Sequence, residues 1–163
     1  MRTITKCVLG LVVVLVIAAF VHPVVARERE KARYQLCYSN LEHIAIGMLL
    51  YLQDNHGRLP DAAHWQDQLF PYIKDRQVYV CPNAEPGAGG GYAMAPSLGG
   101  AKVSDYPDPS LVIVFFDADA AGSPITRHQG RMQCAFLDGH VYSMPRGMEY
   151  IGAPRDMPPR ARK

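Results

Sequence analysis

The sequence predicts an α+β fold, with one long N-terminal helix and short antiparallel strands toward the C-terminus. Two observations support this prediction. Apolar residues recur at helical spacing after an uncharged N-terminal run, and an Asp-Gly pair separates two strand-like segments near the other end. At 163 residues the chain is long enough for an anchor and one modest domain.

The N-terminal segment is long and apolar enough to cross a membrane. No charged residue occurs in 8–21, and the apolar stretch extends to Ala26. A membrane-spanning helix needs about 20 such residues. We therefore expect 1–26 to be a retained membrane anchor. The alternative is a cleaved secretory signal, because Arg2 and Lys6 give the segment a basic start.

A helix is expected to follow the anchor without a break, over 23–55. Its apolar residues recur every three or four positions and so share one face. They are Cys37, Leu41, Ile44, Met48 and Leu52. The helix should end near Gly57, which can adopt a left-handed cap, and Pro60 prevents it from resuming.

Shorter elements are predicted in the rest of the domain. A second helix covers 65–73, and a short strand covers 78–80. The Gly-rich stretch 86–100 is expected to be an irregular loop. The apolar run 111–116 predicts a central strand.

The strongest turn signal is Asp138-Gly139, which predicts a type I′ hairpin between 132–137 and 140–144. In that hairpin Leu137 would face His140, and Phe136 would face Val141.

The same region carries a recognisable signature. His128 is followed by nine residues and then by Asp138 and Gly139, and helical landmarks precede it in the expected order. In these features the chain resembles pilin-like proteins related to type II secretion pseudopilins and type IV pilins of bacteria. The resemblance implies a pilin-like α+β domain over 27–150, in which the long helix packs on a small antiparallel sheet. A basic tail, 151–163, would follow.

The resemblance also implies a function and a location. The expected protein is a structural subunit of a secretion or surface apparatus, not an enzyme. It would cross the inner membrane once, export its C-terminal domain to the periplasm or cell surface, and contact like subunits or pilus-assembly components.

The chain departs from the family pattern at its start. The glycine followed by Phe-Thr-Leu-Ile-Glu, where a prepilin peptidase cuts, is missing, and Lys6 falls near the glutamate's position. This favours the alternative of an exported monomeric binding module with a pilin-like fold.

Composition argues against two other classes of function. The net charge is only +2, with acidic and basic residues interspersed, so no nucleic-acid partner is expected. No serine has the G-x-S-x-G context of a hydrolase nucleophile, and Cys134 would lie inside a strand.

Four cysteines occur without any C-x-x-C pair, which argues against a zinc ribbon or a thioredoxin-like site. Cys7 belongs to the anchor. Cys37 and Cys81 form a candidate disulfide, which would close a loop of roughly 45 residues and add about 4 kcal/mol in the chain-entropy model. The other interpretation is two buried free thiols.

A metal site is the alternative interpretation of several polar residues. Oxygen ligands suit calcium, whereas mixed histidine and aspartate ligands suit a transition metal. The candidates are Asp117, Asp119, His128, Asp138 and His140. We favour structural roles for them, with Asp138 in the turn, Asp117 at a strand end and His128 bonded to backbone, and we expect no cofactor.

Overall fold

The computed structural model describes residues 2–84, 91–128 and 130–145. The predicted tail, 151–163, and the end of the predicted domain therefore lie outside the described residues. The chain divides into two compact units, Met1–Gln35 and Leu36–Lys163.

The first unit is entirely helical where it is described. It is the N-terminal part of helix α1 (Arg2–Asp54), which runs without interruption through Pro23. Large apolar side chains are exposed along it, including Leu15 and Phe20. In the described part of the chain, α1 is the helix that is long and apolar enough to cross a membrane. The prediction of one continuous helix, from the apolar N-terminal segment into the domain, is confirmed.

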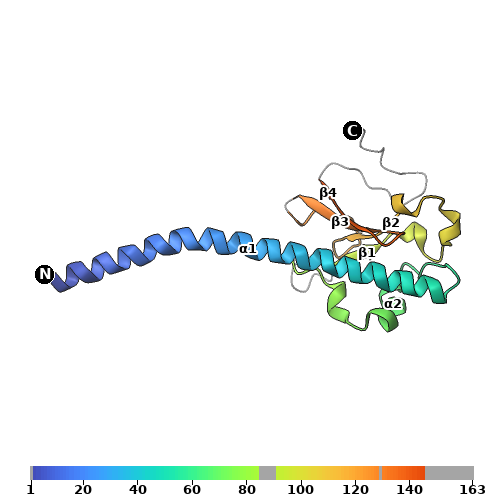
Figure 1. Ribbon diagram of the computed structural model, residues 1–163, viewed down its shortest axis with the longest axis horizontal. Helices are drawn as coiled ribbons and strands as arrows, with labels where there is room; N and C mark the ends of the chain where they lie inside the picture. Colours follow the sequence, from blue (N-terminus) through green and yellow to red (C-terminus); the bar gives the residue numbers. More distant parts are fainter. Residues whose placement is uncertain (1, 85–90, 129, 146–163) are drawn as a thin grey trace. The chain divides into compact units, whose positions relative to one another are not determined.

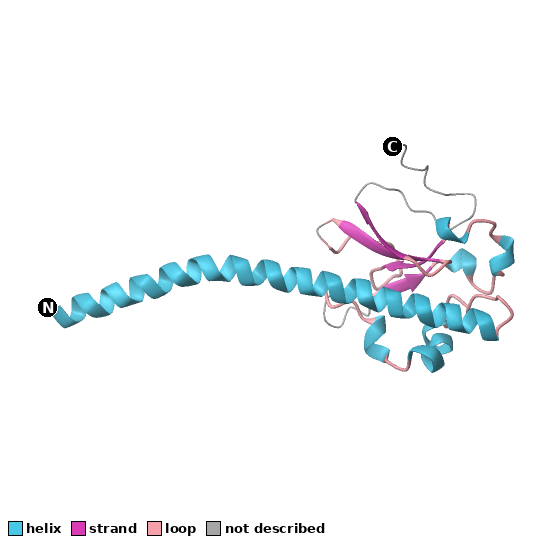
Figure 2. Cartoon of the chain, viewed as in Figure 1, coloured by secondary structure: helices cyan, strands magenta, loops and turns pink. Residues whose placement is uncertain are grey.

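The second unit contains a four-stranded antiparallel sheet (Figure 2). Its strands are β1 (Tyr92–Met94), β2 (Ile113–Asp117), β3 (Arg131–Phe136) and β4 (Val141–Pro145), in that spatial order. Strand β2 is buried at every position, as expected for the central strand predicted from its apolar run. With the helix, this sheet confirms the α+β class.

The C-terminal part of α1 supplies one wall of the core. All five of its predicted apolar positions are buried: Cys37, Leu41, Ile44, Met48 and Leu52. The sheet lies along one side of this part of the helix, and α2 (Trp65–Ile73) lies along another (Figure 1). Gly47 permits the close approach of α2, because a Cβ there would stand 2.5 Å from Ile73 Cγ1.

Helix α1 ends where the sequence predicts. Gly57 has a φ of 72° and donates its N–H to the carbonyl oxygen of Leu52, which is the long hydrogen bond of a Schellman cap. His56 also has a positive φ. Helix α2 has the predicted limits.

The strand predicted over 78–80 is wrong. This segment holds a short 3-10 helix, η1 (Arg76–Tyr79), whose first turn is capped because Asp75 Oδ1 accepts from Gln77 N at 2.8 Å. Val78 and Tyr79 are buried, but Val80 is 56% exposed. The apolar run therefore buries side chains from a turn of helix and not from a sheet.

Three more 3-10 helices of the described chain lie between β1 and β2. They are η2 (Pro96–Leu98), η3 (Val103–Asp105) and η4 (Pro109–Leu111).

The expectation of an irregular loop over 86–100 is also wrong in part, because 92–94 pairs with β2 as an edge strand. Gly91 precedes that strand with a backbone packed against Tyr79, since a Cβ there would stand 2.4 Å from the Tyr79 carbonyl oxygen.

The hairpin is present, but its predicted turn type and register are wrong. Ala135 pairs with Val141, so the loop is one residue longer than a type I′ turn. Leu137 is buried and donates its N–H to Val112, beside β2, and so does not pair with β4. Gly139 is the loop residue with a positive φ, 93°, as in a three-residue loop that ends in a G1 bulge.

Candidate functional site

A disulfide joins the helix to the segment that follows η1. Cys37 comes from α1 and Cys81 from the segment after η1, and their Cα atoms are 5.4 Å apart. Of the two alternatives that the sequence left open, the structure contains the disulfide. Both residues are buried, and the sulfur atoms of both lie within 4.8 Å of side-chain atoms of Asp117 and His128.

His128, the signature histidine, lies next to this disulfide. Its Nε2 is 3.5 Å from Cys81 Sγ, and its Nδ1 is 3.3 Å from Asn83 Nδ2. Its backbone exchanges two hydrogen bonds with Arg131, which closes the loop before β3. The side chain is completely buried. The signature histidine thus enters the core and meets the segment that carries Cys81.

Asp117 ends the central strand and faces the same cluster. It is completely buried, and its Oδ2 accepts a 2.8 Å hydrogen bond from the backbone N–H of Gln133. Its Oδ2 is 3.9 Å from His128 Nε2, and its Oδ1 has no hydrogen-bond partner among the described residues. Burial raises the pKa of Asp117 to about 7, although the hydrogen bond from Gln133 N–H and then the charge of Arg127 partly offset this.

These residues form one compact group, which we call the Cys-Asp-His cluster: Cys37, Cys81, Asp117 and His128. One ligand-type atom from each lies within 4.8 Å of all the others. No second group of three or more such residues comes together in the described part of the chain. The cluster contains two sulfurs, an imidazole and a carboxylate, which is a donor set that suits a transition metal once the sulfurs are thiolates.

The five metal candidates from the sequence do not converge. Only Asp117 and His128 lie together. Asp119 stabilises the conformation of its own loop, because its Oδ1 accepts hydrogen bonds from the backbone N–H groups of Ala121 and Ser123, both at 2.9 Å.

The remaining two candidates form an exposed pair in the hairpin loop. Asp138 Oδ1 is 2.6 Å from His140 Nδ1 and accepts the His140 backbone N–H at 3.1 Å. The His140 ring stacks on Phe136, with ring centroids 4.1 Å apart. Asp138 therefore shapes the turn.

Gly139 has a packing role beyond its turn conformation. A Cβ at this position would stand 2.6 Å from Leu49 Cδ1, on α1. The tip of the hairpin thus approaches the helix so closely that a side chain at this position would require Leu49 to move. Both ends of the signature, His128 and Asp138-Gly139, hold loops against the core.

Sequence reasoning did not assemble the Cys-Asp-His cluster. The sequence indicated Cys37 and Cys81 as a candidate disulfide, and Asp117 and His128 as candidate metal ligands. The two pairs were not combined. A signal was available for three of them, because Cys81 and Asp117 directly follow predicted apolar segments and Cys37 lies on the inner face of the predicted helix. Only the tertiary fold shows that these positions meet.

The thiol on β3 is not activated as a nucleophile. Cys134, the free thiol on β3, is completely buried, and burial raises its pKa, so its reactive thiolate is disfavoured. This fits the prediction from sequence that it lies inside a strand.

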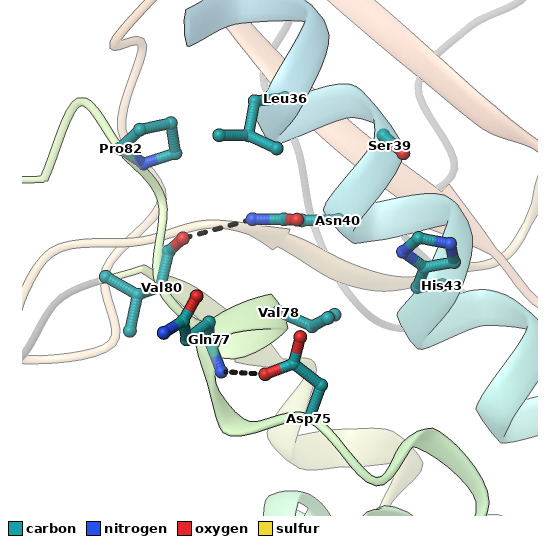
Figure 3. Close-up of a pocket in the computed structure, with 9 residues that line it drawn as sticks. All are labelled: Leu36, Ser39, Asn40, His43, Asp75, Gln77, Val78, Val80 and Pro82. Atoms are coloured by element: carbon teal, nitrogen blue, oxygen red, sulfur yellow. Dashed lines mark hydrogen bonds between the residues drawn. The ribbon is translucent and has the colours of Figure 1, made fainter.

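A groove of about 530 Å³ opens beside α1 and η1 (Figure 3). Its floor is braced by Asn40, whose side-chain amide donates to the Val80 carbonyl oxygen at 3.1 Å. Four apolar and five polar residues line it: Leu36, Ser39, Asn40, His43, Asp75, Gln77, Val78, Val80 and Pro82.

The fold and the cluster define a class of chain: a membrane-compatible helix that continues into a disulfide-linked α+β domain. No family model, no curated protein and no solved structure matches this chain. Its function has to follow from the fold and the site.

Proposed function

We propose that this protein is a membrane-anchored, pilin-like structural subunit of a secretion or surface apparatus. Its C-terminal domain is exported to the periplasm or cell surface, and it carries out no catalysis. The observation that carries this proposal is that α1 has two roles. One uninterrupted helix provides an exposed apolar segment of membrane-spanning length and then one wall of the α+β core.

The exposed apolar side chains support the proposed anchor. They continue around the helix between Leu9 and Val25 and are 41–73% exposed within the protein itself. An apolar surface on all faces of a helix is unfavourable in water, but it is stable in lipid or against other apolar helices. A bilayer, or a bundle of like subunits, would cover it.

The disulfide supports export of the domain. Disulfides persist in oxidising compartments such as the periplasm and the cell surface, and are rare in the bacterial cytosol. Cys37 and Cys81 are both buried in the domain core, where their bond ties α1 to the loop after η1. A subunit that works outside the cytosol gains stability from such a link.

The anchor can be tested in cells that express the full chain. Membranes are washed with alkaline carbonate, and the protein is followed in the pellet and the supernatant. We expect it to stay in the pellet. Val16→Arg should move it to the supernatant, because an arginine in the centre of a span costs about 2.5–3.5 kcal/mol, whereas Val16→Leu should not.

Intact mass and protease digestion complete this test. A full-length mass, with the domain digested only after protease reaches the outer side of the inner membrane, supports the proposal. A mass short by the N-terminal apolar segment would contradict a retained anchor.

The second candidate is an exported monomeric binding module with the same fold. It is favoured by Lys6, which stands near the position where the family carries its glutamate. Electron microscopy and sedimentation of the purified protein over a range of concentrations separate the two. Filaments or concentration-dependent oligomers that Val16→Arg abolishes favour the subunit, and a monomer at all concentrations favours the module.

A further inference from the structure

We propose that the dithiol form of this chain binds one Zn²⁺ through the Cys-Asp-His cluster, with Cys37, Cys81, His128 and Asp117 as its four ligands. The four side chains come from α1, the segment after η1, the loop before β3 and the end of β2. They are 0–1% exposed. This inference does not depend on the proposed function.

The distances suit a tetrahedral metal. Zinc bonds to sulfur, nitrogen and oxygen of about 2.0–2.3 Å place tetrahedral ligand atoms about 3.3–3.8 Å apart. His128 Nε2 is 3.5 Å from Cys81 Sγ and 3.9 Å from Asp117 Oδ2. All four ligand atoms lie within 4.8 Å of one another. Once the two sulfurs are no longer bonded, small side-chain rotations complete the geometry.

A buried carboxylate oxygen points to a ligand independently of the cysteines. The Asp117 side chain is completely buried, and its Oδ1 has no hydrogen-bond partner among the described residues. Such an atom normally has a partner, because leaving it without one costs about 1–3 kcal/mol. A cation bound to this carboxylate through Oδ1, while Oδ2 keeps the Gln133 N–H, would satisfy it.

The surroundings provide the outer contacts that metal ligands need. Gln133 N–H holds Asp117 Oδ2, and Asn83 lies 3.3 Å from the far nitrogen of the His128 ring. With the Asn83 amide turned over, its oxygen accepts from Nδ1–H and leaves Nε2 free to bind the metal. Hydrogen bonds of this kind orient the ligands of zinc sites.

Charge balance also favours a divalent ion. Two thiolates and one carboxylate bring three negative charges into the core, and Zn²⁺ neutralises two of them. The guanidinium of Arg127, whose charge acts on Asp117, supplies a third positive charge. Arg127 Nη1 is buried and has no hydrogen-bond partner among the described residues, so this charge faces the protein interior.

The metal and the disulfide exclude each other, because both use the same two Sγ atoms. A dithiol reductant gives two electrons and two protons to the Cys37–Cys81 bond and becomes a disulfide itself. Zn²⁺ then displaces the two thiol protons and binds the thiolates. A chain that has not yet been oxidised reaches the second step directly.

The test uses the full chain in detergent. One sample is kept oxidised, and the other is reduced with dithiothreitol and freed of reductant under anaerobic conditions. Each is loaded with Zn²⁺, desalted and assayed for bound metal. We expect one zinc per reduced chain and none per oxidised chain. Co²⁺ in place of zinc should give thiolate-to-cobalt charge transfer and the strong visible bands of a tetrahedral ion.

Variants locate the site. His128→Gln and Asp117→Asn should each weaken zinc binding by about 100-fold or more, since each removes a ligand. His140→Gln is the matched control, because it removes a histidine that is paired with an aspartate outside the cluster. It should bind zinc as the native chain does.

Three results would overturn the proposal. They are no bound zinc in the reduced native chain, cobalt spectra without thiolate bands, or an equal loss of binding in His140→Gln and His128→Gln. The first two results are measured on the native chain, so they test the proposal even if a variant fails to fold.

Discussion

The hydroxyl of Tyr92 donates a 3.1 Å hydrogen bond to the backbone carbonyl oxygen of Cys37. This bond joins the edge strand β1 to the helix residue that carries the disulfide. Tyr92 is buried, and burial strongly raises the pKa of its phenol. The strand, the helix and the loop that contains Cys81 therefore meet at one point of the core.

Tyr92→Phe should lower the free energy of unfolding by about 1–2 kcal/mol, because it removes this buried hydrogen bond and keeps the ring. Urea unfolding followed by circular dichroism measures the loss. Tyr142→Phe is the control, since Tyr142 is 50% exposed and should change stability little. Equal effects of the two changes would mean that the bond to Cys37 contributes nothing measurable.

The disulfide should stabilise the domain by about 2–4 kcal/mol. The Cys37→Ala and Cys81→Ala double variant should lose that amount in urea unfolding without added metal. Reductant should destabilise the native chain by a similar amount and leave the double variant unchanged. A native chain that is insensitive to reductant would show that the bond does not form in the isolated protein.

Asp117 should make stability depend on pH in the oxidised, metal-free protein. An aspartate ionises near 3.8 when unfolded, but the pKa of Asp117 is about 7 in the fold. Between these values the folded chain holds a proton that the unfolded chain has released. Stability should therefore fall as the pH rises from about 4 to 7, by on the order of 4 kcal/mol at most, and then level off.

The comparison with Asp117→Asn isolates this effect. His128 and Arg127 face the same carboxylate, and the amide keeps an acceptor for Gln133 N–H while it removes the titrating proton. Urea midpoints at pH 4.5 and 8, with chelator present, should differ less in the variant than in the native chain. An unchanged difference would assign the pH dependence to another group.

The sequence predicted the elements with strong local signals. The 3–4 residue spacing from Cys37 to Leu52 identified the buried face of α1, and the limits of α2 agreed with the structure. Gly57 marked the helix end because few other residues favour its φ of 72°. These features depend on residues close together in the sequence.

The errors arose where distant segments decide the local structure. Leu137 bonds to Val112 near β2, which changes the hairpin loop and its register. Val78 and Tyr79 are buried in the core without pairing to a neighbouring strand. The apolar run therefore forms the 3-10 helix η1 and not the predicted strand. The Cys-Asp-His cluster was missed for the same reason, because its four members come from separate elements.

The Gly139 position tests whether the signature glycine is needed for packing or only for its turn. Gly139→Ala adds a Cβ at a φ of 93°, and that Cβ would stand 2.6 Å from Leu49 Cδ1. Gly122→Ala is the matched control, because its φ is 81° but no atom lies within 4 Å of the added Cβ. Both variants should lose about 1–2 kcal/mol to backbone strain.

Only Gly139→Ala should also lose the overpacking contribution, about 1–3 kcal/mol. In a double-mutant cycle, Leu49→Ala should recover that second part, because it removes the methyl groups that the new Cβ meets. Urea unfolding of the four chains of the cycle measures the coupling. Additive effects of Gly139→Ala and Leu49→Ala would show that the hairpin tip does not press on α1, and would leave the turn conformation as the only role of this glycine.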